Sequence, residues 1–273
     1  MVQRSSTKVA WRRLVAQKPG WGFWVGTTLL LPPVRALSAR TWLDAHRLPA
    51  SGGCIVVFNH LSYLDPLMTG DLLWSRGRIP RYLVKEALFR PPFFGAVLRN
   101  AKQIPVARLT THAQDAYGAA VDAVRAGECL AVYPEGTLTR DPDLWPMRGK
   151  SGAARIALET GAPVIPVAHW GAQDTLGPYA RFPRLWPRGR VTLRVGEPVD
   201  LADLLEQEVT PQVIQQATDR IMAALVALLE ELRQAEAPAE RFDPRDRGIQ
   251  QIGNPRRRRA RLGRTSRKKG DAR

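Results

Sequence analysis

The stretch Ile-Val-Val-Phe-Asn-His-Leu-Ser-Tyr-Leu-Asp-Pro, residues 55–66, decides the fold of this chain. Its first four residues are apolar and mostly β-branched, which is typical of a short strand buried on both faces. The apolar run stops at Asn59 and His60. Asp65 followed by Pro66 is typical of a helix start, with Asp as the N-cap and Pro as the first helical residue. A buried strand that leads into a helix predicts an α/β fold.

His60 is expected just past the carboxyl end of this strand, which is the edge where open α/β sheets bind their ligands. Asp65 lies one short loop away, close enough to turn back and hold the imidazole ring. A histidine held by a carboxylate can act as a general base near neutral pH. The alternative is that His60 only ends the strand and Asp65 only caps the helix. This stretch alone leaves both interpretations open.

Apolar runs alternate with helical patterns along the rest of the chain. Strands are predicted at residues 54–58, 81–84, 102–106, 129–133, 163–168 and 190–196. Helices are predicted at residues 66–75, 112–126, 150–160 and 210–233, and residues 171–189 are predicted to form a long surface loop. This alternation predicts a mixed, largely parallel sheet flanked by helices.

The 273 residues are enough for one large α/β domain. Cys54 and Cys129 both lie in apolar runs, so we expect buried thiols in a reducing compartment. The sequence has no Cys/His cluster with zinc spacing, and no metal site is predicted.

Three segments are expected. Residues 1–49 form a basic and apolar helical segment, residues 50–233 form the α/β domain, and residues 234–273 form a disordered polybasic tail. Residues 254–273 hold ten Lys and Arg against one acid, so they contribute +9 of the net charge of +16. Such a tail attracts an anionic membrane or RNA, or is simply solvated.

Residues 21–31 (WGFWVGTTLLL) form the most apolar window of the N-terminal segment, and the prolines at 32 and 33 are expected to close it. The window is shorter than the roughly 20 residues that span a bilayer. Its aromatic residues and flanking basic residues favour contact with a membrane interface. A signal peptide and a plain amphipathic helix packed on the core remain alternatives.

A second informative stretch is Tyr-Pro-Glu-Gly-Thr at residues 133–137, which also follows an apolar strand. Gly136 permits close approach of a ligand to the backbone, while Glu135 and Thr137 offer an acceptor and a hydroxyl group. An ordinary polar turn between a strand and a helix is the alternative.

Several cations are expected near the same edge of the sheet. Lys85 and Arg108 follow two other strands, and Arg140 and Lys150 follow residues 133–137 near the start of a helix. Basic side chains near a helix N-terminus favour an anion site.

Four blocks of the sequence, taken in order, resemble the glycerophosphate acyltransferase family, specifically the 1-acyl-glycerol-3-phosphate acyltransferases. The first block, NHLSYLD at 59–65, matches the family's NHxxxxD. The other three are KEALFRPPFFGAVLRNAKQIPVAR at 85–108, YPEGT at 133–137 and APVIPV at 162–167. The resemblance covers about residues 50–200.

The resemblance implies transfer of a fatty acyl group from acyl-CoA or acyl carrier protein to the hydroxyl of 1-acyl-glycerol-3-phosphate, giving phosphatidate. His60 would be the general base and Asp65 would orient its ring. Arg108, Glu135, Gly136 and Thr137 would bind the glycerol-phosphate end of the acceptor. No cofactor beyond the acyl donor is implied. The direct attack needs no enzyme nucleophile, in agreement with the lack of a GxSxG motif.

The chain departs from the family at Leu138, where an arginine commonly follows EGT. Arg140 or Lys150 would then take the acceptor's phosphate, and Lys85 is a further candidate. Another lysophospholipid or a glycolipid is therefore an alternative acceptor. A non-catalytic protein that binds anionic membranes or nucleic acid is the alternative of another class, although no specific nucleic acid partner is expected. For an enzyme of lipid acceptors we expect peripheral or monotopic binding at the cytoplasmic face of the cell membrane.

Overall fold

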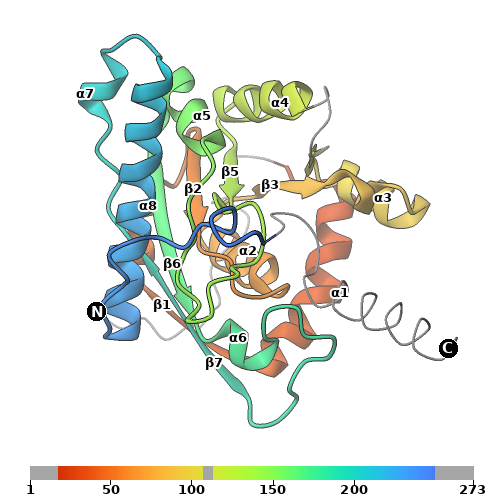
Figure 1. Cartoon of the computed structure of the whole chain (residues 1–273). Helices are drawn as coiled ribbons and strands as arrows, with labels where there is room; N and C mark the ends of the chain where they lie inside the picture. Colours follow the sequence, from red (N-terminus) through yellow and green to blue (C-terminus); the bar gives the residue numbers. More distant parts are fainter. Residues whose placement is uncertain (1–17, 107–112, 250–273) are drawn as a thin grey trace, which may run out of the picture.

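The computed structural model of the protein describes residues 18–106 and 113–249 (Figure 1). Within these residues the strands form one seven-stranded sheet in the order β1-β7-β6-β2-β5-β3-β4. Every pairing is parallel except that of β6 with β7. The predicted mixed, largely parallel sheet is thereby confirmed.

The strands are β1 (Ser38–Leu43), β2 (Cys54–Phe58), β3 (Pro80–Lys85), β4 (Ile104–Val106), β5 (Cys129–Val132), β6 (Val164–Trp170) and β7 (Gly189–Val195). The α-helices are α1 (Trp21–Leu37), α2 (Asp65–Ser75), α3 (Pro92–Asn100), α4 (Ala113–Arg125), α5 (Gly152–Thr160), α6 (Ala172–Thr175), α7 (Ala202–Leu205) and α8 (Pro211–Arg233). Two short 3₁₀ helices cover Ala45–Arg47 and Glu86–Phe89.

The central strand β2 is buried along its whole length because helices cover both faces of the sheet. Successive side chains of a strand point to opposite faces. Ile55 and Val57 accordingly pack into a core with α4, α5 and α8. Val56 and Phe58 pack into a second core with α2 and the end of α1. Both cysteines are free and buried, on paired positions of β2 and β5.

Strand β1 and helix α3 were not predicted from the sequence. The sequence of β1 has a single apolar pair at its end, and the strand exists because it pairs in register with β7. The sheet therefore begins at Ser38, inside the segment assigned to 1–49. Helix α3 begins at Pro92, with Pro91 as its N-cap. It packs against α1, and Ala101 at its end lies in a small core with Phe23 (Figure 1).

The expectation that the prolines close the helix at residue 31 is wrong. Helix α1 continues through Pro32 and Pro33 to Leu37. Leu31 and Val34 are buried on either side of the two prolines, so packing against the domain offsets the missing backbone hydrogen bonds. Among the residues described, no helix combines the length and the apolar character that crossing a membrane requires.

The tail differs from the expectation in its first part. Residues 234–249 run back over the domain, where the Phe242 carbonyl accepts a hydrogen bond from the Arg148 N–H and Arg241 pairs with Asp219 on α8. These contacts hold a polar segment that has no apolar periodicity of its own. Residues 250–273, which include all of the basic residues counted at 254–273, lie outside the described residues.

Candidate active site

Three neighbouring strands deliver polar side chains to one edge of the sheet. His60 follows β2, Glu135 follows β5, and His169 lies near the end of β6. Because β5 and β6 flank β2 and run parallel to it, their carboxyl ends meet at the same place. The edge predicted from the sequence is therefore where these groups gather.

The His60 ring is held by Asp65. Nδ1 of His60 lies 2.9 Å from Oδ2 of Asp65, and the same oxygen accepts hydrogen bonds from the N–H groups of Leu61 (2.6 Å) and Ser62 (2.8 Å). Asp65 is fully buried, whereas the His60 side chain keeps 16% exposure. A carboxylate oxygen only accepts, so Nδ1 carries the proton and Nε2 is the basic nitrogen.

The predicted N-cap role of Asp65 is wrong by one position, since Leu64 is the N-cap of α2. The Asp65 side chain instead turns back to the loop of residues 60–62, as the general-base interpretation requires. The N–H groups of His60, Leu61 and Ser62 are all engaged within the site, so none of them is free to stabilise an oxyanion.

Tyr133 forms one wall of the site. Its ring stacks on the His60 ring with 4.2 Å between centroids, and its hydroxyl lies 2.9 Å from the Thr69 hydroxyl. Burial raises the pKa of Tyr133 well above its usual value, so the phenol stays protonated at neutral pH. The stacked ring limits the imidazole to one orientation.

Glu135 is turned inward rather than toward a ligand. Its two carboxylate oxygens accept hydrogen bonds from the N–H groups of His60 and Met147, each at 3.0 Å. The side chain is buried, and burial raises the pKa of Glu135 to about 8. The structure differs here from the expectation that Glu135 contacts the acceptor, because the carboxylate braces the backbone of the histidine loop.

His169 is a site residue that the sequence analysis missed. Its backbone exchanges two hydrogen bonds with the Asn59 side chain, each 2.9 Å long. Its Nε2 lies 2.8 Å from the Asn59 carbonyl and 3.5 Å from Oδ2 of Asp65. The sequence did contain an indication of this position. His169 comes at the end of an apolar run predicted as a strand, as His60 does, and both strands end at the same edge of the sheet.

The remaining predicted substrate-binding residues fall into three groups. Arg108 lies outside the described residues. Lys85 is exposed at the end of β3, two strands away from β2, and no described contact brings it to His60. Gly136 and Lys150 lie together: Gly136 has a φ of +69°, and a Cβ there would meet the Lys150 Nζ at 2.8 Å. Thr137 is partly exposed beside Gly136.

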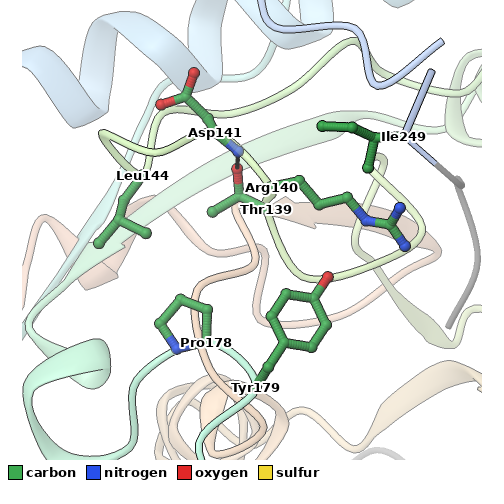
Figure 2. Close-up of a pocket in the computed structure, with 7 residues that line it drawn as sticks. All are labelled: Thr139, Arg140, Asp141, Leu144, Pro178, Tyr179 and Ile249. Carbon is green, nitrogen blue, oxygen red and sulfur yellow. Dashed lines mark hydrogen bonds between the residues drawn. The ribbon is translucent and has the colours of Figure 1, made fainter. Parts of the chain in front are cut away.

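Arg140 lies in a pocket of about 370 Å³ next to the histidine loop. The pocket is lined by Thr139, Arg140, Asp141, Leu144, Pro178, Tyr179 and Ile249. Figure 2 shows the Arg140 side chain extended toward the side where Tyr179 and Ile249 also reach. The Thr139 N–H donates to the His60 carbonyl at 2.8 Å, so the pocket wall is joined directly to the histidine loop.

Leu138 is buried, and its carbonyl accepts a hydrogen bond from the Tyr179 hydroxyl at 3.1 Å. Leu138, at which the family resemblance predicts an arginine, therefore contributes packing. No group of three or more His, Cys, Asp or Glu side chains within residues 18–106 and 113–249 is arranged to hold a metal ion.

The geometry supports one kind of chemistry. An oriented, partly exposed imidazole can take a proton, and cations lie on the adjoining loop. Residues 41–170 match the model of the family described as Acyltransferase, so this segment is an acyltransferase-family domain.

Two relatives and one solved structure illustrate the match. The chain is 33% identical over 126 residues to a chloroplastic 1-acyl-sn-glycerol-3-phosphate acyltransferase of Brassica napus, covering 45% of this chain and 35% of the relative. It is 30% identical over 131 residues to a 1-acyl-sn-glycerol-3-phosphate acyltransferase of Borreliella burgdorferi, covering 48% of this chain and 50% of the relative. The chain thus spans half or less of these relatives' length.

The fold is shared with the 1-acyl-sn-glycerophosphate acyltransferase PlsC of Thermotoga maritima, with a TM-score of 0.56 over 79% of this chain and 85% of that one. The two sequences are 22% identical there. The likeness concerns the arrangement of the sheet and its helices.

Proposed function

We propose that this protein transfers a fatty acyl group from an acyl thioester to the free hydroxyl of 1-acyl-glycerol-3-phosphate, giving phosphatidate. The observation that carries the proposal is the His60 Nδ1 to Asp65 Oδ2 contact of 2.9 Å at the exposed edge of the sheet. The names of the relatives and the acyltransferase match over residues 41–170 support the choice of reaction.

In the proposed reaction Nε2 of His60 takes the proton of the acceptor hydroxyl as its oxygen attacks the thioester carbonyl. The carbon–sulfur bond then breaks, and the thiolate receives the proton held by His60. Asp65 stabilises the imidazolium that forms between these steps. No acyl-enzyme forms and no cofactor besides the acyl donor takes part.

We assign the acceptor's phosphate to Arg140 and Lys150, with Gly136 and Thr137 beside them. This assignment is supported by the place of Arg140 in the pocket that adjoins the His60 carbonyl and by the buried, apolar Leu138. Arg108 and Lys85 remain candidate phosphate contacts on the predicted edge.

The proposed donor is acyl-CoA or acyl carrier protein, and the proposed place of action is the cytoplasmic face of the cell membrane. Trp21 and Trp24 support membrane contact because they lie exposed on α1. No specific nucleic acid partner is part of this proposal.

The decisive experiment measures acyl transfer from a long-chain acyl-CoA to 1-acyl-glycerol-3-phosphate by the full chain. His60→Ala is expected to lower kcat by roughly a hundredfold or more, as for a lost general base. His46→Ala is the matched control, because His46 is exposed in the 3₁₀ helix Ala45–Arg47, away from the site. Full activity of His60→Ala would remove His60 as the base.

The acceptor is tested with a panel of lysophospholipids and glycolipids that share one acyl chain. Arg140→Ala is expected to raise KM for the phosphate acceptor, whereas Arg148→Ala, exposed on the same loop, is expected to leave it unchanged. Turnover of a different acceptor in preference to 1-acyl-glycerol-3-phosphate would keep the chemistry and replace the proposed product.

A further inference from the structure

The segment of residues 178–188, between α6 and β7, presents unusually large apolar side chains to solvent. Phe182 is 74% exposed, Leu185 is 68% exposed and Trp186 is 84% exposed. Single exposed apolar residues are ordinary, but three large ones within five positions form a patch of the kind that marks an interaction site. We call residues 178–188 the aromatic–arginine loop.

The same loop is strongly basic. Arg181, Arg184 and Arg188 alternate with the apolar residues, and Arg190 follows in β7. The sequence has no Asp or Glu from residue 176 to residue 190. The Arg181 guanidinium lies over the Phe182 ring, 5.3 Å from its centroid. A loop that interleaves cations with exposed aromatic side chains matches the chemistry of an anionic bilayer surface.

Specific hydrogen bonds hold the loop in place. The Arg184 N–H donates to the Thr175 carbonyl at 2.7 Å. The Arg188 guanidinium donates to the carbonyls of Arg35 (2.6 Å) and Ser38 (3.2 Å), where α1 passes into β1. The exposed side chains are therefore presented by a fixed backbone, which lowers the entropy that binding has to remove.

Two helices near the loop also expose large apolar side chains. Helix α1 exposes Trp24 and Leu29, and α3 exposes Phe93 and Phe94. Figure 1 shows α3, α1 and the loop in succession along one side of the molecule, with the end of α1 beside the loop. The hydrogen bonds from Arg188 to Arg35 and Ser38 thus place the loop beside the end of α1.

The loop also reaches the candidate active site. Pro178 and Tyr179, at its start, line the pocket that holds Arg140. The Tyr179 hydroxyl bonds to the Leu138 carbonyl, and the Tyr179 ring meets the Tyr63 ring edge-on, with 6.4 Å between centroids. Phe182 follows Tyr179 by only three positions in the chain.

We propose that the aromatic–arginine loop is a membrane-contacting element, separate from α1, that docks the protein on an anionic bilayer. Phe182, Leu185 and Trp186 enter the interfacial region while Arg181 and Arg184 contact lipid phosphates. Docking through this loop brings the pocket mouth at Tyr179 to the lipid surface. The inference deepens the proposed function by adding a partner surface, but its binding test requires no catalysis.

The test uses the full chain and vesicles of phosphatidylcholine with and without phosphatidylglycerol. The variant with Phe182→Ser, Leu185→Ser and Trp186→Ser is expected to bind the anionic vesicles at least about tenfold more weakly than wild type. Arg181→Gln with Arg184→Gln is expected to reduce the preference for anionic over neutral vesicles. The matched control is Leu205→Ser with Val209→Ser, which should bind like wild type. Leu205 ends α7 and Val209 lies between α7 and α8, and both are exposed apolar residues.

A second measurement follows insertion directly. An environment-sensitive fluorophore is attached to the thiol introduced by Trp186→Cys. Labelling is specific to this position because Cys54 and Cys129 are buried. The emission of the fluorophore is expected to shift to shorter wavelength on addition of anionic vesicles, and unchanged thermal unfolding confirms that each variant folds. Wild-type vesicle binding by the triple variant, with no shift of the probe, would overturn the proposal.

A protein partner is the competing occupant, and it is tested by titrating an acidic acyl carrier protein in the absence of lipid. Binding of that protein that depends on the loop, together with vesicle binding that does not, would assign the loop to a protein and overturn the membrane proposal. Loss of vesicle binding in the triple variant supports the loop proposal even if no acyl transfer is detected. If the protein acylates a detergent-dispersed acceptor but the vesicle tests do not show binding through the loop, the loop proposal is rejected and the proposed acyltransferase function stands.

Discussion

At the scale of single residues, the site is a set of hydrogen bonds that fix one imidazole. Asp65 holds Nδ1 of His60, Tyr133 stacks on the ring, and Glu135 holds the His60 N–H. Asp65 and Tyr133 fix the orientation of the ring, and Glu135 fixes the backbone that carries it, while the His60 side chain keeps 16% exposure. Preorganisation of this kind is what a general base requires.

His169 is expected to be a positioning residue that acts through Asn59 and Asp65. Removing its Nε2 donor in His169→Phe should lower kcat by about tenfold or more with little change in KM, because the residue is buried behind Asn59 and Asp65. His169→Gln, which keeps a donor for the Asn59 carbonyl, should recover part of the loss. Steady-state kinetics of both variants checks this, and an equal loss in the two variants would contradict the role of the donor.

Glu135 should make stability depend on pH. Its folded-state pKa of about 8 lies above the ordinary value of 4.5, so between these pH values the folded state binds a proton that the unfolded state releases. The stabilisation from protonated Glu135 is therefore complete below about pH 4.5 and is lost as the pH rises toward about 8.

The non-titrating variant Glu135→Gln supplies the reference for that measurement. The free energy of unfolding of wild type minus that of the variant should decrease from about pH 5 to about pH 8 in urea titrations. A difference that stays constant or grows with pH would contradict the raised pKa.

At the scale of elements, α8 shows how a local pattern becomes a docked helix. Its apolar stripe, including Ala217, Ile221 and Leu225, is buried against the sheet as the sequence periodicity predicts. Thr210 caps its N-terminus by accepting a hydrogen bond from the Val213 N–H at 3.3 Å.

Removal of this cap should destabilise the protein measurably. Thr210→Ala is expected to lower the free energy of unfolding by about 1 kcal/mol, because one N–H of the first turn loses its acceptor. Thr210→Ser keeps the hydroxyl and should remain within a few tenths of a kcal/mol of wild type. Chemical denaturation distinguishes the two, and equal stability of all three proteins would show that the cap contributes nothing.

At the scale of the whole molecule, a buried carboxylate joins the N-terminal segment to the α/β domain. Asp71 on α2 pairs with Arg35 at the end of α1 and with Arg40 on β1. The Asp71 side chain is 1% exposed and that of Arg40 is 13% exposed, so loss of the carboxylate leaves a largely buried cation.

Asp71→Asn is therefore expected to cost about 3 kcal/mol of stability, the lower end for a broken buried pair because Arg35 is half exposed. The matched control is Asp203→Asn, whose partner Arg220 lies on the surface, and it should cost much less stability than Asp71→Asn because solvent screens the exposed pair. Urea unfolding of both variants checks the contrast, and similar losses would contradict it.

The sequence by itself determined the features that depend on neighbours in the chain. The buried strand β2, the spacing that returns Asp65 to His60 and the stripe of α8 follow from side-chain period and loop length, which covalent geometry sets locally. The largely parallel sheet also followed, because alternating strands and helices leave few ways to cover both faces.

Only the tertiary structure decided which distant groups meet. Glu135 bonds to a backbone N–H 75 positions away, and Asn59 bonds to His169 across 110 positions. The pairing of β1 with β7 is of the same kind, as is the path of α1 through two prolines. These features depend on packing free energy between segments far apart in the chain, which no local pattern encodes. The general-base role of His60 could thus be predicted from the sequence, whereas the long-range hydrogen bonds that orient His60 could not.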